Sequence, residues 1–159
     1  MEFYDWLLAL HLLAAGALVS ALVLYSVVIA TGWTLALPSD ISRMFRLSRA
    51  GDVAIAVGSI GTLVFGIWLA IDSDAYQVWD GWIIAAIVLW ALAMETGRRT
   101  GTVYNAARDR ARALVGEGRD TPDPELSALV RSSTGLALHA ATVVLVVALL
   151  VVMIYKPGA

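Results

Sequence analysis

Four long apolar stretches, separated by polar connections, dominate the hydrophobic pattern of the chain. They cover about residues 6–30, 53–71, 79–97 and 136–155. Each is close to the roughly 20 residues that an α-helix needs to cross about 30 Å of hydrocarbon. Because lipid cannot satisfy unpaired backbone groups, four such stretches are expected to be helices and not strands of an open sheet. The pattern therefore predicts an all-α fold, a four-transmembrane-helix bundle that forms a single domain over residues 1–159.

The connections carry their own signals. Residues 98–115 are rich in helix formers and contain no proline, so the third span is expected to continue as a polar helix. The following segment GEGRDTPDPE has two glycines and two prolines and predicts a short hinge within an arm of about residues 98–131. Pro38 is interpreted as the stop signal of the first helix. Asp52 is interpreted as a residue of the N-cap region of the second span, where the helix dipole favours a carboxylate.

Charge orients the predicted bundle. Ten of the eleven basic residues are arginines in two connections: Arg43, Arg46, Arg49, Arg98, Arg99, Arg108, Arg110, Arg112, Arg119 and Arg131. The eleventh, Lys156, lies beyond the fourth span. The other side carries acidic residues and an aromatic belt: Glu2, Asp5, Asp72, Asp74 and Asp80, with Trp6, Trp68, Trp79, Trp82 and Tyr155. The positive-inside rule then places the arginine connections, with the helical extension after the third span, in the cytoplasm and both termini outside. The start MEFYD lacks a basic region, so the first stretch is expected to remain as a helix and not to be a cleaved signal peptide.

Composition excludes several classes of protein. The chain is 60% hydrophobic and 15% charged, against roughly 45–50% and about 25% in soluble domains. A net charge of −2 argues against nucleic acid as a partner, and the absence of cysteine excludes disulfides, thiolate zinc sites and iron–sulfur clusters. Phosphate-binding loops, HExxH and GxSxG motifs are missing from the sequence, which argues against an NTPase or a hydrolase. With no complete catalytic set, the sequence leaves enzymatic activity open.

Ionisable and sulfur-containing residues inside the spans are the candidate functional residues. His11 and His139 lie in opposite leaflets, on the order of 15 Å apart along the membrane normal, too far to bind one iron together. Depth instead pairs His11 with Met153 and His139 with Met94. A histidine and a methionine are a known axial pair for haem, so these four residues are the predicted cofactor-binding residues. The alternative is that the histidines bond between helices and the methionines fill space.

Glu95 has two interpretations. It is expected either to reach the interface beside Arg98 and Arg99, or to meet His139 at the same depth. A buried carboxylate–imidazole pair would tie the third span to the fourth and hold the imidazole in its charged form. A proton or small-solute path along Glu95 and His139 is a further reading of the same pair.

Small residues recur at helical spacing on several spans. Ala54, Gly58, Thr62 and Gly66 form one stripe, Gly16 and Ser20 begin another, and Gly135 and Thr142 share a face with His139. Such stripes allow close approach of helix backbones in lipid, so we expect them to be packing surfaces. The last stripe predicts that His139 points into the bundle.

Three segments also carry a resemblance to a known family. They are WLLALHLLAAGALV around His11, RLSRAGDVAIAVGSIGTLVFGIWLA at the second span, and the closing MIYKPG. Across all four spans the chain resembles a bacterial family of four-helix integral membrane proteins with a domain of unknown function. That family is similar to copper-resistance protein D and to the membrane protoporphyrinogen oxidase that binds haem b. The resemblance implies a multi-pass protein of the bacterial plasma membrane, with His11 as a haem or metal ligand. The oxidase's lysine in the third span has no counterpart here.

Two hypotheses of function follow from the residues and the resemblance. The first is a small membrane protein that binds haem or a metal ion through His11, for redox chemistry or metal handling. The second is a non-catalytic accessory subunit of a larger membrane complex, with partner subunits or further copies of itself as its neighbours in the bilayer.

Overall fold

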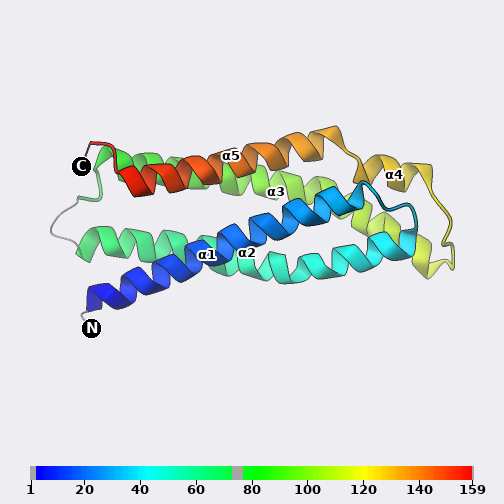
Figure 1. Cartoon of the computed structure of the whole chain (residues 1–159), viewed down its shortest axis with the longest axis horizontal. Coiled ribbons are helices and arrows are strands. Elements are labelled where there is room, and N and C mark those ends of the chain that lie inside the picture. The colour runs from blue at the N-terminus through cyan, green and yellow to red at the C-terminus, as the bar shows by residue number, and fades with distance from the viewer. Residues whose placement is uncertain (1–2, 73–76, 159) are drawn as a thin grey trace.

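The computed structural model describes residues 3–72 and 77–158, which form five helices and, within these ranges, no strand (Figure 1). In chain order they are α1 (Phe3–Gly32), α2 (Pro38–Asp72), α3 (Gly81–Gly116), α4 (Pro124–Val130) and α5 (Ser133–Tyr155). Helices α1, α2, α3 and the α4–α5 segment are long and apolar enough to cross a membrane. The predicted all-α bundle with four membrane-spanning helices is therefore confirmed, and the chain has the build of a small multi-pass integral membrane protein.

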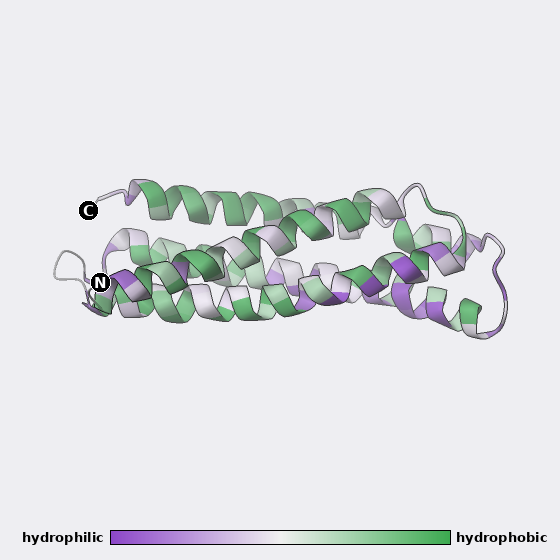
Figure 2. Ribbon diagram, turned by 60° about the horizontal axis from the view of Figure 1, so that its bottom comes forward, coloured by the Kyte–Doolittle hydropathy of each residue, from purple (hydrophilic) through white to green (hydrophobic). Residues whose placement is uncertain are grey.

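The bundle has two distinct ends (Figure 1). At the end that we call the terminal end lie both ends of the chain, the end of α2 and the start of α3. At the opposite end, called the arginine end, lie the link between α1 and α2, the end of α3, and α4. Hydrophilic colour gathers in the half of the bundle next to the arginine end (Figure 2). The placement of this end in the cytoplasm stays a prediction of the positive-inside rule.

The second helix begins earlier than the apolar pattern predicted. Helix α1 ends at Gly32, and Pro38 is the first residue of α2, where its missing N–H costs no helical hydrogen bond. Asp52 therefore lies in the interior of α2, and the prediction that it belongs to an N-cap region is wrong. Its carboxylate instead accepts a hydrogen bond from the Tyr25 hydroxyl of α1.

The third helix continues as predicted, without a break, from Gly81 to Gly116. It ends before the segment of residues 117–123, in which Gly118 has a positive φ of 71°. Beyond this turn, however, the chain folds back as α4. The Asp123 side chain caps α4 by accepting a hydrogen bond from the backbone N–H of Leu126 at 2.8 Å, and it pairs with Arg110 of α3 at 3.1 Å.

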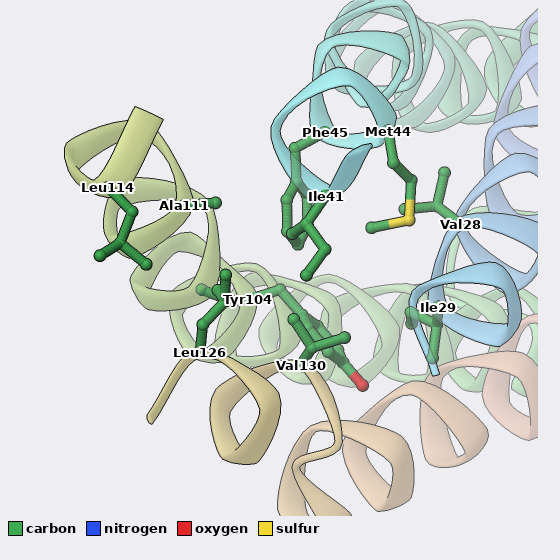
Figure 3. Packing of buried hydrophobic residues seen from close by; sticks show 11 residues of the cluster. Val28, Ile29, Ile41, Met44, Phe45, Tyr104, Ala111, Leu114, Leu126 and Val130 are labelled. Atoms are coloured by element: carbon green, nitrogen blue, oxygen red, sulfur yellow. The ribbon is translucent and has the colours of Figure 1, made fainter. Parts of the chain in front are cut away.

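Helix α4 completes a packed apolar core at the arginine end, which we call the cap (Figure 3). Its buried residues come from α1, α2, α3 and α4: Val28, Ile29, Ile41, Met44, Phe45, Tyr104, Ala107, Ala111, Leu114, Leu126 and Val130. Leu126 has none of its surface exposed. Residues 98–131, predicted as an arm with a hinge, thus form one side of a folded unit.

The spans themselves pack through small residues. On α2, Gly58 meets the backbone of α1, and Thr62 of the same stripe is buried. Gly135 of α5 lies against the ring of Tyr104, while the Thr142 hydroxyl donates to Thr96 of α3 at 2.9 Å. The predicted stripe that starts at Gly16 is wrong. In the described part of the chain nothing lies within 4 Å of a side-chain carbon placed there.

Candidate functional site: a cleft around His11

A cleft of about 430 Å³ lies between α1, α2, α3 and α5 in the terminal half of the bundle. Helix α1 packs mainly on α2, and α3 mainly on α5, whereas α1 and α5 meet over only a short stretch. The two helix pairs therefore leave space between them. Polar and aromatic side chains on an otherwise apolar wall distinguish this cleft: Tyr4, His11, Thr62, Trp82, Trp90 and Lys156.

His11 is buried on the inner face of α1, with 7% of its surface exposed. Its Nδ1 is buried without a hydrogen-bond partner in the described part of the chain. Gly66 makes room for the imidazole, because a Cβ at this position would lie 3.0 Å from Cε1 and 3.3 Å from Nδ1. Gly66, the last residue of the predicted stripe, thus accommodates a side chain and not a helix backbone.

Met153 of α5 lines the same cleft as His11, so the structure brings together the two residues that the depth argument paired. Two tryptophans of α3 complete the wall. The Trp90 indole N–H donates to the carbonyl of Ser59 at 3.2 Å, and the Trp82 ring lies under Lys156, whose Nζ is 5.6 Å from the ring centroid. These contacts hold both indole rings in place on the side of α3.

His139 lies elsewhere. It is buried on α5 and lines a smaller cavity of about 270 Å³ with Ser26 and Trp33. As predicted, it points into the bundle, where its Nε2 is 2.8 Å from the Ser26 hydroxyl oxygen of α1. Met94 is half-buried on α3 and does not line either of these cavities. The four predicted cofactor-binding residues therefore fall into one pair at the cleft and two residues outside it.

Glu95 does not pair with His139, and that hypothesis is wrong. Its carboxylate accepts hydrogen bonds from Arg98 at 2.8 Å and Arg99 at 2.7 Å on the surface of α3. Residues three and four positions apart are neighbours on a helix, so both guanidinium groups are within reach of the Glu95 carboxylate. The alternative interpretation of Glu95, beside the two arginines, is confirmed. A proton path along Glu95 and His139 loses its basis with the pair.

Three of the residues that define the cleft were not predicted as site residues. Thr62 was read only as part of a packing stripe, Trp82 only as a belt residue, and Lys156 only as the basic residue beyond the last span. For Lys156 the sequence does contain a signal, which is its distance from the other basic residues. All of those lie from Arg43 to Arg131. Within residues 3–72 and 77–158, no three His, Asp or Glu side chains come together as metal ligands.

The comparisons with known proteins add no relative: no family model, curated protein or solved structure matches this chain. The resemblance to the four-helix membrane family thus stays a prediction from the sequence.

Proposed function

We propose that this small integral membrane protein binds haem in the cleft between its two helix pairs, with His11 as an axial ligand. The observation that carries the proposal is the state of His11. Its imidazole is buried at an apolar cleft and keeps Nδ1 without a hydrogen-bond partner in the described part of the chain. Buried polar atoms are normally hydrogen-bonded, so an unpartnered imidazole nitrogen at a cleft is a candidate metal ligand.

The cleft suits an apolar cofactor in size and chemistry. Ligand pockets typically measure about 300–1,000 Å³ and have apolar and aromatic walls with a few polar groups. The volume of about 430 Å³ and the two tryptophans on α3 agree with this description.

Met153 is the second candidate ligand, because it lines the same cleft from α5. Histidine–methionine ligation raises the reduction potential of haem iron, and the bound group would supply one-electron transfer. His139 and Met94 are no part of the proposal, since neither lines this cleft. A bare metal ion is also a poorer fit than haem, because the cleft offers one imidazole and one thioether and no carboxylate.

The test is haem titration of the purified protein in lipid nanodiscs, followed by absorption spectroscopy. We expect a saturable Soret band with 1:1 stoichiometry, lost or shifted in His11→Ala and unchanged in the matched variant His139→Ala. Met153→Leu should change the position of the band, whereas Met94→Leu should not. A Soret band that is identical in the wild type and His11→Ala would overturn the proposal. A wild-type protein that takes up no haem but co-migrates with other membrane subunits on a native gel would favour the accessory role.

A further inference from the structure

The last turn of α5 directs Lys156 toward the cleft. Lys156 caps the helix in the left-handed conformation, with φ 42° and ψ 59°, and its N–H donates to the carbonyl of Val152 at 2.9 Å. Among the described residues it is the one non-glycine with a positive φ, a conformation that costs energy for most side chains. The preceding residue, Tyr155, is 77% exposed, whereas Lys156 is half-buried and lines the cleft. The turn thus separates a residue that faces outward from one that faces the cleft.

The charge of Lys156 is unusual for its position. The other ten basic residues of the sequence lie between Arg43 and Arg131, toward the arginine end, whereas Lys156 follows the end of α5 at the terminal end. Its ammonium group lies over the face of the Trp82 ring, which attracts cations and fixes the position of the charge. A positive charge is thereby held at the rim of an apolar cleft.

We propose that Lys156 binds a propionate group of the haem at the rim of the cleft, while the apolar part of the macrocycle extends toward His11. The inference rests on the proposed function, since it requires haem in this cleft. Haem carries two carboxylates on one edge of an apolar disc, and an ammonium group supplies three donors to such an acceptor. The positions of Lys156 and His11 in the cleft would therefore fix which edge of the disc faces the terminal end. Lys156 also interacts with other groups of the chain, so the propionate competes with those interactions.

The test compares haem with its dimethyl ester, in which both acid groups are blocked. In nanodiscs, the wild type should bind the free acid roughly tenfold more tightly than the diester, the factor expected of one charge-assisted hydrogen bond near the surface. Lys156→Asn should abolish this preference and retain the turn, because asparagine tolerates the left-handed conformation. Lys156→Arg should restore it, and Arg131→Gln, which removes a charge at the arginine end, should leave it unchanged. Empty nanodiscs give the partition of each porphyrin into lipid.

A second probe separates this inference from the proposed function. Iron-free protoporphyrin IX has the same two propionates and no axial ligand, and quenching of tryptophan fluorescence reports its binding. We expect Lys156→Asn to weaken its binding roughly tenfold and His11→Ala to leave it within about twofold. Equal affinity of the wild type for haem and its diester would overturn the role of Lys156 and leave His11 ligation intact. Haem binding that needs Lys156 but not His11 would contradict the proposed ligation alone.

Discussion

Gly58 of α2 lies so close to Leu18 of α1 that a Cβ on the glycine would be 2.7 Å from the backbone nitrogen of Leu18. The same carbon would be 2.9 Å from the carbonyl oxygen of Ala14. Both partners are backbone atoms, which cannot turn away as the end of a flexible side chain can. The absence of a side chain at Gly58 therefore sets the spacing between α1 and α2, and with it the position of His11 one helical turn before Ala14.

The first prediction concerns this contact. Gly58→Ala should force α1 and α2 apart and lower the free energy of unfolding by about 1–3 kcal/mol, the usual range for overpacking. Gly16→Ala is the matched control, because no atom lies within 4 Å of a Cβ there in the described part of the chain. It should be neutral or stabilise α1 by roughly 0.5–1 kcal/mol, since alanine is the better helix former. Thermal unfolding in nanodiscs measures the stability of both variants. Equal changes in stability would show that the close contact at Gly58 does not stabilise the α1–α2 pair.

The contrast between these glycines shows how far the sequence predicts the packing. Spacing alone identified small-residue stripes on both α1 and α2, and only the stripe on α2 packs on a helix. In a membrane, the face of a helix toward lipid and the face toward a neighbour are equally apolar, so the hydrophobic pattern does not separate them. The four spans and the continuation of α3 are different, because length and composition determine them. They were predicted correctly.

The cap was missed for another reason. Ile41, Met44 and Phe45 follow the spacing of a helical face, but they lie among arginines and fall outside the long apolar stretches. Helix α4 has seven residues, too few to give a periodic pattern of its own. Its position depends on contacts with α2 and α3 that are distant in sequence. The cleft likewise depends on contacts between distant parts of the chain. It lies where α1 and α5 make few contacts, and no short stretch of the sequence indicates this arrangement.

The second prediction tests the cap core. Leu126 is completely buried, so Leu126→Ala should destabilise the protein by about 2–5 kcal/mol through lost burial and the cavity left behind. Leu47→Ala on α2 is the control, because Leu47 is 67% exposed. Chemical denaturation measures the loss of unfolding free energy. Hydrogen exchange of residues 117–131 reports local opening of the cap. Faster exchange there with unchanged exchange in α1 would show that the cap unfolds separately from the spans.

The third prediction is a pH dependence of the cap. The N–H of Leu126, and secondly Arg110, hold the pKa of the Asp123 carboxyl below its ordinary value. A carboxyl whose pKa is lower in the folded state stabilises the fold above its unfolded pKa and loses that contribution as the pH falls through the folded pKa. The hydrogen-exchange protection of α4, corrected for the slower intrinsic exchange at low pH, should therefore fall below about pH 4. Asp123→Asn keeps a capping acceptor without a titrating charge, so its α4 should respond less to acid; an identical response would exclude Asp123 as the cause.

The fourth prediction compares two tyrosines at helix contacts. The Tyr104 hydroxyl is buried against Gly135 and has no hydrogen-bond partner in the described part of the chain. Tyr104→Phe should thus be neutral or stabilising by about 1 kcal/mol. Tyr25→Phe should instead destabilise, because it removes the hydrogen bond to the Asp52 carboxylate between α1 and α2. We expect thermal unfolding to show lower stability for Tyr25→Phe and equal or higher stability for Tyr104→Phe. Lower stability of Tyr104→Phe would indicate that the Tyr104 hydroxyl is hydrogen-bonded.

The last prediction concerns the partner of His139. The Ser26 hydroxyl lies 3.0 Å from the carbonyl of Leu22 and 2.8 Å from His139 Nε2. Depending on the His139 tautomer, the serine hydroxyl donates to Nε2 or accepts from its N–H, and in both cases the bond ties α1 to α5. A double-mutant cycle of Ser26→Ala and His139→Ala should give a coupling of about 0.6 kcal/mol, typical of such bonds between membrane helices.

The cycle of Glu95→Gln and His139→Ala should instead be additive within about 0.5 kcal/mol, because Glu95 bonds to Arg98 and Arg99. Coupling in the second cycle with none in the first would contradict the observed contacts. The expected pattern gives His139 a structural role between helices and leaves His11 as the histidine with an unpartnered ring nitrogen at a cleft.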